Sequence, residues 1–192
     1  MKRLPLLGAL ILCCLLAFGQ EFKVGSKVSD FQITDLRGNA VSYSALKGDI
    51  TVVVFIATKC PVSNGYNGRM TALYNDYASK GVKFVFVNAN ASEPASEVEE
   101  HARTHQFPFP VYKDMGNKVA DRFGAQVTPE TFVMDSSGTI RYHGHIDDNL
   151  NETRIQKQSL RTALDALLAG KPPATTETKA FGCTIKRSRS VS

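Results

Sequence analysis

The chain has 192 residues, a formal net charge of +5, 43% hydrophobic residues and 21% charged residues. This length suits one domain of ordinary size, and the hydrophobic fraction excludes global disorder. No internal repeat is visible, which argues against a solenoid, and four cysteines are too few for a disulfide scaffold.

Residues 1–19 have the pattern of a secretory signal peptide. Met1-Lys2-Arg3 is basic, Leu4 to Phe18 is almost wholly apolar, and Ala17-Phe18-Gly19 supplies small residues before a cleavage point at Gln20. The alternative is an uncleaved membrane anchor, but an apolar run of about 15 residues is short for a spanning helix. We therefore expect cleavage and export, to the periplasm or outside the cell, with no membrane contact by the mature chain.

Cleavage would change the charge and the cysteine count. Without Lys2 and Arg3 the net charge falls to +3, and much of it lies in the tail segment 186–189. Such a solvated basic tail does not indicate a nucleic-acid partner. The mature chain keeps only Cys60 and Cys183, which is one potential pair in an exported protein.

The remaining residues predict strands and helices in alternation. Alternating or continuous apolar runs predict strands, and apolar residues at helical spacing predict helices. In chain order we expect a strand at 31–36 that opens a hairpin, a buried strand at 51–56, a helix containing Met70, Leu73, Tyr74 and Tyr77, a buried strand at 82–88, a helix within 92–106, a short extended piece at 111–114, a helix at 117–123, a hairpin of 131–135 and 139–143, and a helix containing Leu160, Leu164, Leu167 and Leu168.

This order predicts a three-layer α/β domain over residues 20–170. The central strands are expected to be parallel and covered by helices on both faces, and the closing hairpin adds antiparallel edge strands. Residues 171–192 are rich in Thr, Pro and Lys and are predicted to form a flexible tail that carries Cys183.

Cys60 is the strongest candidate for chemistry. It follows the buried strand and precedes a helix, so it should meet unpaired backbone N–H groups and the positive end of the helix dipole. Both favour the thiolate and hence a nucleophile near neutral pH, with Lys59 and Arg69 as further positive charges. The alternative is a buried structural cysteine, since cysteine is often interior.

Two segments resemble a known family. Residues 55–63 resemble the Phe-x-Ala-x-x-Cys-x-x-Cys segment of thioredoxin-fold proteins, and residues 127–138 resemble the segment around their cis-proline. Over residues 24–170 the chain is similar to the peroxiredoxin-like branch of the redoxins, related to alkyl hydroperoxide reductase and thiol-specific antioxidant proteins. The resemblance implies a thioredoxin-like fold with a mixed central sheet flanked by helices. It also implies a cis Thr128–Pro129 bond that turns the Thr128 backbone toward the sulfur, where an extended substrate can pair with it.

The sequence departs from this family in two places. Ser63 replaces the second cysteine of the dithiol motif, so the internal disulfide of a thioredoxin cannot form, although its hydroxyl can donate a hydrogen bond to the Cys60 thiolate. Val53 and Ala57 stand where a peroxiredoxin has Pro and Thr or Ser, so the hydroxyl that binds the peroxide is missing. Thr58 is a possible substitute, displaced by one position.

Cys183 is a candidate resolving cysteine, because a mobile second thiol can reach a sulfenic acid on Cys60 and form a disulfide. The alternatives are a free tail thiol and a thiol that pairs with another chain. His143 and His145, followed by Asp147 and Asp148, suggest a metal site, but solvated edge-strand histidines are the favoured interpretation and no metal ligand is assigned.

We expect an exported thiol oxidoreductase. Cys60 attacks a peroxide or a protein disulfide, Cys183 or an external thiol donor resolves the product, and no organic or metal cofactor is required. One alternative is a thiol-exchange protein that captures its partners, because Ser63 cannot release a mixed disulfide. The other is a binding module or metal-handling protein that has lost redox turnover.

Overall fold

The computed structural model describes residues 22–188, so the expected signal peptide and the last four residues lie outside the described part. No helix in the described part is long and apolar enough to cross a membrane. The strands are β1 (Gln32–Thr34), β2 (Ala40–Ser42), β3 (Ile50–Ile56), β4 (Val82–Asn88), β5 (Val111–Lys113), β6 (Val127–Thr128), β7 (Glu130–Asp135), β8 (Ile140–Gly144) and β9 (Cys183–Thr184). The α-helices are α1 (Tyr43–Leu46), α2 (Pro61–Gly65), α3 (Asn67–Tyr77), α4 (Ala95–Thr104), α5 (Lys118–Phe123) and α6 (Ser159–Leu168), and short 3-10 turns are η1 (Ala78–Lys80), η2 (Met115–Asn117) and η3 (Glu152–Arg154).

Seven strands form one mixed sheet in the order β2-β1-β5-β4-β3-β7-β8. β3, β4 and β5 are parallel, while β7 is antiparallel to β3 and β8 is antiparallel to β7. The expected parallel centre and closing hairpin are therefore confirmed. One detail differs, since β7 lies inside the sheet against β3, and of the two hairpin strands only β8 lies at an edge of the sheet.

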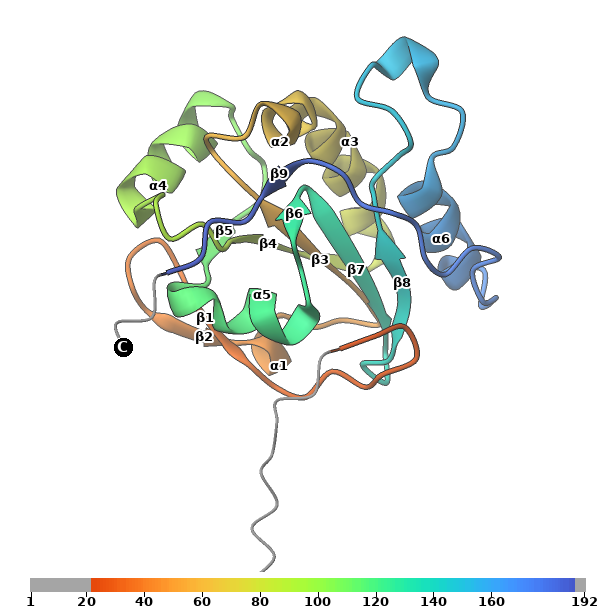
Figure 1. Ribbon diagram of the computed structural model, residues 1–192. Coiled ribbons are helices and arrows are strands. Elements are labelled where there is room, and N and C mark those ends of the chain that lie inside the picture. The colour runs from red at the N-terminus through yellow and green to blue at the C-terminus, as the bar shows by residue number, and fades with distance from the viewer. Residues whose placement is uncertain (1–21, 189–192) are drawn as a thin grey trace, which may run out of the picture.

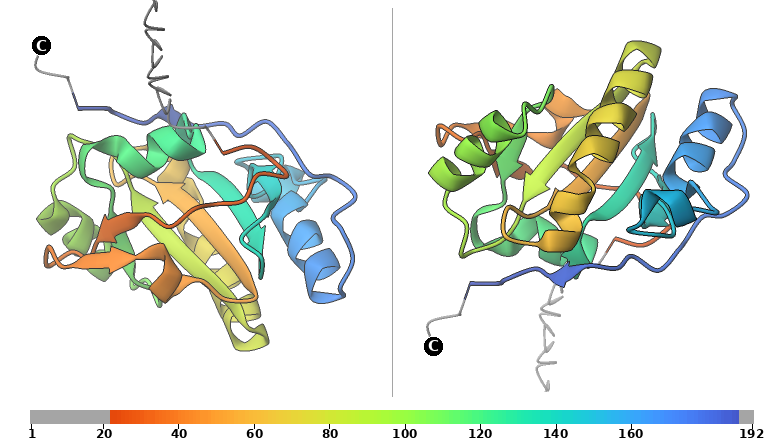
Figure 2. Two further views of the ribbon diagram at one scale, coloured as in Figure 1. Left: turned by 90° about the horizontal axis from the view of Figure 1, so that it is seen from below. Right: turned by 90° about the horizontal axis from the view of Figure 1, so that it is seen from above.

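Helices cover both faces of the sheet (Figures 1 and 2). On β3 alternate side chains enter opposite cores: Val52 and Val54 pack with residues of α3 and α6, whereas Val53 and Phe55 pack with residues of α1 and α5. Both faces are buried, which explains why β3 is continuously apolar in the sequence. The three-layer α/β, thioredoxin-like architecture expected from the sequence is confirmed.

A second, two-stranded sheet lies beside the end of β3 and is the part of the fold that matters most for the site. β6 pairs antiparallel with β9, so a segment near the C-terminus runs along the edge of the domain next to the start of α2 (Figure 1).

Candidate active site

Cys60 occupies the N-cap of α2, where β3 has ended and the chain turns into the helix. Pro61 stands at the first helical position, which suits a residue with no N–H, and the Cys60 sulfur accepts a hydrogen bond from the Ser63 backbone N–H at 3.3 Å. The residue is only 3% exposed. The position between strand and helix expected from the sequence is confirmed, and it places the Cys60 sulfur within hydrogen-bond distance of the Ser63 N–H.

The Thr128–Pro129 peptide bond is cis, as the resemblance implied. The Thr128 carbonyl oxygen lies 3.4 Å from the Cys60 sulfur, so the backbone of β6 faces the thiol. The place expected for an extended substrate is taken by the chain itself, because Thr128 is paired with Cys183 of β9. The structure thus brings Cys60, Thr128, Pro129 and Cys183 together.

The two thiols influence each other, and their pKa values move in opposite directions. Burial raises the pKa of the Cys60 thiol, but hydrogen bonds from the Cys183 side chain and from the Ser63 N–H outweigh it and leave that pKa below its ordinary value. The hydrogen bond to Cys60 and burial raise the pKa of Cys183. Cys60 is therefore the more acidic thiol of the pair. Because α2 has only five residues, these individual hydrogen bonds explain the shift better than a helix dipole does.

The segment that carries Cys183 is fixed to the domain by a series of contacts. The Lys186 N–H donates to the Asn90 side chain at 2.6 Å, and the Ala91 N–H donates to the Lys186 carbonyl at 2.8 Å. Ile185 is 3% exposed and belongs to the core that includes α5. For residues 183–186 this differs from the flexible tail expected over residues 171–192, of which 189–192 lie outside the described part. The polar composition of this segment predicts disorder, but backbone pairing with β6 and the burial of Ile185 are sufficient to order it.

A buried carboxylate supports the loop that precedes Cys60. One oxygen of Glu93 accepts the Thr58 N–H at 2.9 Å, and the other accepts the Lys59 N–H at 3.1 Å and the Asn90 side-chain N–H at 3.0 Å. Burial raises the pKa of Glu93, but these hydrogen bonds together hold it below its ordinary value. The Lys113 ammonium donates to the Glu93 backbone carbonyl at 2.7 Å, and burial lowers the pKa of that lysine.

Asn90 connects the two halves of the site. Its side-chain N–H donates to Glu93, the carboxylate that accepts hydrogen bonds from the loop before Cys60. Its side-chain oxygen accepts a hydrogen bond from the Lys186 N–H, in the segment that carries Cys183. The sequence analysis did not select Glu93 or Asn90. The signal in the sequence was a group of polar side chains, including Asn90 and Glu93, directly after the buried strand 82–88. Polar side chains that are buried there must form hydrogen bonds with neighbouring groups.

On the other side, Glu130 supports β6. One of its oxygens accepts the N–H groups of Gln126 and Val127, at 2.7 and 3.0 Å, and the other lies 2.7 Å from His143 Nε2. Glu130 is 4% exposed and directly follows Pro129. It fixes the short strand that pairs with β9.

Several expected contacts differ in the structure. The Ser63 hydroxyl accepts the Ala57 N–H at 3.1 Å, so Ser63 reaches the Cys60 sulfur through its backbone N–H rather than its hydroxyl. The Thr58 hydroxyl donates to Glu97 at 2.6 Å. Lys59 pairs with the same Glu97 at 2.7 Å, because a carboxylate on α4 is the nearer partner for both.

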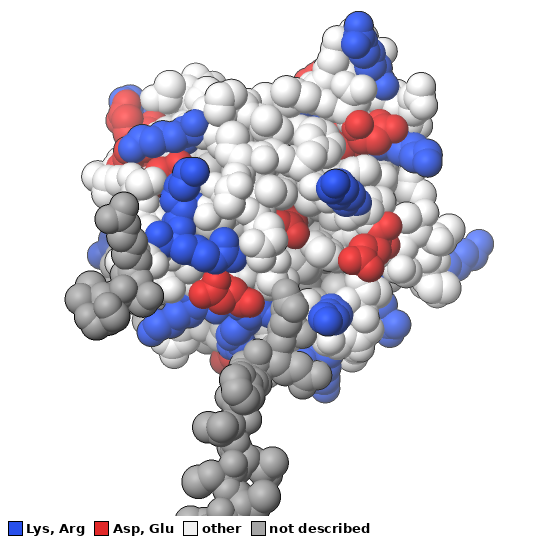
Figure 3. Space-filling model, viewed as in Figure 1, with Lys and Arg blue, Asp and Glu red and all other residues white. Residues whose placement is uncertain are grey.

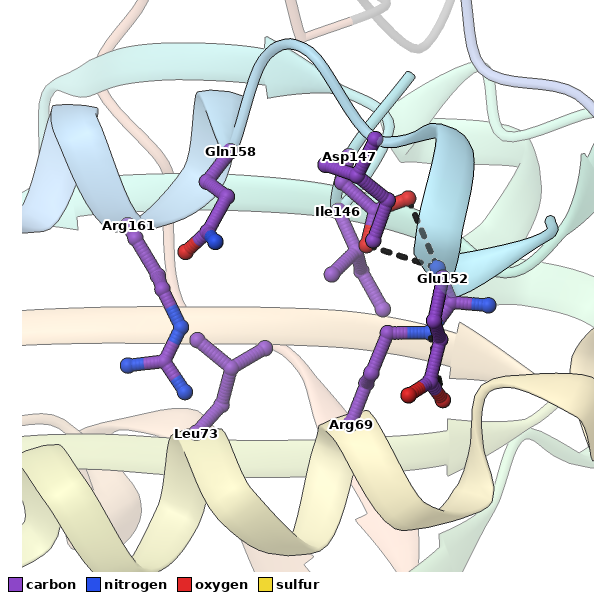
Figure 4. A pocket seen from close by; sticks show the side chains of 8 residues that line it. Arg69, Leu73, Ile146, Asp147, Glu152, Gln158 and Arg161 are labelled. Atoms are coloured by element: carbon purple, nitrogen blue, oxygen red, sulfur yellow. Dashed lines mark hydrogen bonds and ion pairs between the residues drawn. The ribbon is translucent and has the colours of Figure 1, made fainter. Parts of the chain in front are cut away.

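Arg69, the other cation expected near the thiolate, pairs instead with Asp147 at 2.8 Å and stacks on the Tyr66 ring at 3.6 Å. Arg69 and Asp147 border a pocket of about 250 Å³ between α3 and α6 (Figure 4). Its lining includes neither cysteine. Arg69 therefore holds the loop before α6 to α3 and does not act on the thiol.

The family model of the AhpC/TSA family matches residues 24–143. The chain belongs to the AhpC/TSA family. Among curated proteins, the thiol-disulfide oxidoreductase ResA of Halalkalibacterium halodurans is 30% identical over 118 residues, which cover 62% of this chain and 66% of that protein. ResA of Geobacillus kaustophilus is 28% identical over 151 residues, 73% of this chain and 86% of that protein. The chain thus spans about two thirds of the first of these relatives.

Solved structures agree on the fold. An uncharacterized conserved protein from Geobacillus kaustophilus superposes with a TM-score of 0.82 at 32% identity, covering 88% of this chain and 95% of the other. Peroxidoxin BcpB from Mycobacterium tuberculosis gives a TM-score of 0.55 at 23% identity, over 63% of this chain and 84% of the other, and shares the fold. This AhpC/TSA member therefore groups by sequence with thioredoxin-like thiol-disulfide oxidoreductases.

His143 and His145 of this AhpC/TSA member do not converge on one point. His143 contacts Glu130, and His145 Nε2 lies 2.9 Å from the Ser159 hydroxyl. Asp147, which the sequence suggested as a further ligand, is paired with Arg69. Within residues 22–188 no group of three His, Cys, Asp or Glu side chains is placed to hold a metal ion.

Proposed function

We propose that this protein is a thiol-disulfide oxidoreductase whose redox pair is Cys60 and Cys183. The observation that carries the proposal is the pairing of Cys183 with Thr128, whose carbonyl oxygen lies 3.4 Å from the Cys60 sulfur, so that β9 brings together two cysteines that lie 123 positions apart in the chain. Ser63 removes the usual second cysteine, and β9 supplies another at the same nucleophile. The names of the ResA relatives support the same activity.

The reduced pair can reduce a disulfide in two steps. The Cys60 thiolate attacks one substrate sulfur, the substrate S–S bond breaks, and the first substrate thiolate leaves while a mixed disulfide forms at Cys60. Cys183 then loses its proton and attacks the Cys60 sulfur, which releases the second substrate thiolate and forms the Cys60–Cys183 disulfide. Two electrons pass from the cysteine pair to the substrate, and an external thiol donor must restore them.

A disulfide is favoured over a peroxide as the substrate. Ala57 has no hydroxyl, and the Thr58 hydroxyl, the nearest replacement along the chain, is engaged by Glu97. Without a hydroxyl at position 57, the Cys60 thiolate lacks the group that orients the O–O bond in a peroxidase of this family. A disulfide needs no such hydroxyl, because exchange requires only that a substrate sulfur reach Cys60. Cys60 is buried and β9 occupies the edge of β6, so β9 must separate from β6 to admit the substrate.

The test compares two substrates and two variants. The reduced protein should exchange with a model protein disulfide and should react with hydrogen peroxide no faster than a small-molecule thiol of similar pKa. Cys60→Ser should abolish exchange, and Cys183→Ser should accumulate a mixed disulfide between Cys60 and the substrate. Rapid peroxide consumption, or a Cys183→Ser variant with normal turnover, would contradict the proposal.

We also propose that the protein works after export, in the periplasm or outside the cell. Support comes from the basic and apolar pattern of residues 1–19 and from the retention of a single cysteine pair. N-terminal sequencing of the protein from its host should begin at Gln20. A chain that keeps Met1 to Gly19 and remains in the cytoplasm would overturn this part of the proposal.

A further inference from the structure

We propose that this oxidoreductase selects protein disulfides in which the attacked cysteine follows a glycine and is flanked by bulky apolar residues two positions before and two positions after it. The inference rests on the proposed function and names the substrate class. It is carried by residues 181–185, Phe-Gly-Cys-Thr-Ile, which occupy the place beside Cys60 that a substrate must take.

Residues 181–185 cover the approach to the Cys60 sulfur. That sulfur is buried against the Ser63 N–H at 3.3 Å and the Thr128 carbonyl oxygen at 3.4 Å, and β9 pairs with Thr128 itself. Exchange requires contact between Cys60 and a substrate sulfur. A substrate must therefore displace β9 and put its own cysteine where Cys183 lies, so it meets the surfaces that residues 181–185 now contact.

Phe181 fills an apolar seat on one side of the cysteine. Its ring centroid lies 6.2 Å from that of Tyr66 and 6.1 Å from that of His145, both in edge-on contact, and it packs on the core that includes α3 and α6. Burial lowers the pKa of His145, so the imidazole brings no charge to this seat at neutral pH. A large apolar side chain two positions before a substrate cysteine fits the same seat.

Ile185 fills a second apolar seat on the other side of the cysteine. It is 3% exposed and belongs to the hydrophobic cluster that contains Val119, Phe123 and Ala125. Its N–H donates to the Gln126 carbonyl at 2.9 Å, which fixes the backbone as well. A branched apolar side chain two positions after a substrate cysteine would be buried in the same way.

The alternation of side chains along a strand explains the spacing of the two seats. Side chains two positions apart lie on the same face, so Phe181 and Ile185 share the inward face with Cys183. Thr184 lies on the opposite face and is exposed. A substrate in the same register therefore presents its cysteine together with both neighbours at this spacing.

The position directly before the cysteine has no room for a side chain. A Cβ on Gly182 would meet the Thr128 carbonyl oxygen, and that oxygen is backbone that cannot turn aside. A substrate strand in the same register meets the same carbonyl, so glycine is favoured before its cysteine.

The surface around the two seats carries little charge. The face over β9 and α2 is largely uncharged, with Lys and Arg side chains on either side of it (Figure 3). Recognition at such a surface depends on apolar contact, so the side chains that fill the seats define the substrate class better than charge does.

The test measures exchange with a panel of peptide disulfides. A peptide of residues 179–187, with its cysteine joined to 5-thio-2-nitrobenzoate, is mixed with the reduced protein. The Cys60 thiolate bonds to the peptide sulfur, the S–S bond to nitrothiobenzoate breaks, and the coloured nitrothiobenzoate thiolate leaves with the electron pair. Its release gives the exchange rate. Cys183 then loses its proton, attacks Cys60 and releases the peptide, whose thiolate takes up a proton.

The parent peptide should react fastest. Phe181→Ala, Gly182→Ala or Ile185→Ala in the peptide should each lower the second-order rate constant by about tenfold, the effect of losing or misplacing one buried apolar side chain. The matched control has the same composition, with Phe and Gly exchanged and Thr and Ile exchanged. It should react no faster than the same adduct of free cysteine, and equal rates for the control and the parent peptide would overturn the inference.

Two variants of the protein locate the first seat. Phe181→Ala in the protein empties the seat and leaves Tyr66 and His145 in place, so the parent peptide should react several-fold faster. His145→Glu puts a carboxylate beside the seat, so the preferred residue two positions before the cysteine should change from Phe to Lys. Unchanged rates and preference in both variants would overturn the inference.

The panel separates this inference from the proposed function. If no peptide disulfide exchanges with the parent protein, the proposed function fails as well. If all the peptides exchange at one rate, only the inferred substrate class fails.

Discussion

At Cys60, hydrogen bonding outweighs burial. A buried thiol normally has a raised pKa, but Cys183 and the Ser63 N–H donate to this sulfur and stabilise the thiolate more than burial disfavours it. The lowered pKa of Cys60 therefore depends on Cys183, a residue from the far end of the chain.

This dependence predicts the effect of substituting Cys183. Cys183→Ala removes a donor, so the pKa of Cys60 should rise, and the pH at which Cys60 becomes reactive toward iodoacetamide should rise with it. Cys183→Ser keeps a hydroxyl donor and should shift the profile less. Because the pKa of Cys60 is lowered in the folded parent, its alkylation should persist to lower pH than that of a free cysteine. Identical profiles for the parent and both variants would show that Cys183 does not act on the thiol.

At the scale of elements, the close approach of β9 to β6 depends on Gly182. Its φ is +153°, a conformation that side chains rarely adopt, and a Cβ there would overlap the Thr128 carbonyl oxygen. Backbone cannot move aside as a flexible side chain can, so only glycine allows Cys183 to reach Cys60.

Gly182→Ala should therefore lift β9 from β6 and slow formation of the Cys60–Cys183 disulfide, measured by alkylation trapping during oxidation. Gly68→Ala is the matched control, because Gly68 lies in α3 and a Cβ there meets nothing within 4 Å. The control should oxidise at the parent rate. A Gly182→Ala variant that also oxidises at that rate would show that the β6–β9 pairing does not deliver Cys183.

Asn90 joins the loop before Cys60 to the segment of Cys183, so its loss should loosen both. Asn90→Ala removes the acceptor of the Lys186 N–H, and the disulfide should become easier to reduce in a glutathione titration by about threefold to tenfold, the effect of one or two hydrogen bonds.

Asn39→Ala is the control, since Asn39 makes comparable hydrogen bonds to Asp35 in an exposed turn far along the chain from either cysteine. It should leave the glutathione equilibrium unchanged. An equal change in both variants would mean that Asn90 acts through general stability alone.

For the whole molecule, the hydrophobic pattern is sufficient to predict the central strands and the longer helices, but not the short helix α1 or the break between α2 and α3. β3 and β4 are apolar on both faces, and the helices that cover them carry apolar residues at helical spacing. The ion pairs around the site could not be predicted in the same way. Lys59 and Arg69 find carboxylate partners on neighbouring elements, and no sequence spacing shows which cation pairs with which acid.

The C-terminal segment shows the same limit. Its composition predicts a mobile tail, and its order depends on pairing with β6 and on the burial of Ile185, which are contacts between distant parts of the chain. Cys183 could be selected as a candidate from the cysteine count, but its position beside Thr128 could not.

A disulfide between Cys60 and Cys183 would close a loop of 123 positions, so oxidation should stabilise the whole fold. For a loop of this size the lost chain entropy raises the free energy of unfolding by up to about 5 kcal/mol, less any strain that the crosslink introduces into the native state. Urea unfolding of the oxidised and reduced protein measures the difference, and Cys183→Ser should show none. Equal stability of the two forms of the parent would argue that the crosslink does not form in the native structure.

The central claim is that these two cysteines are one redox pair, and peptide mapping of the protein oxidised by one equivalent of a disulfide tests it most directly. We predict a single disulfide, Cys60–Cys183, within one chain, at a yield independent of protein concentration. Oxidised protein in which Cys60 remains a free thiol, or in which the disulfide joins two chains, would contradict the account.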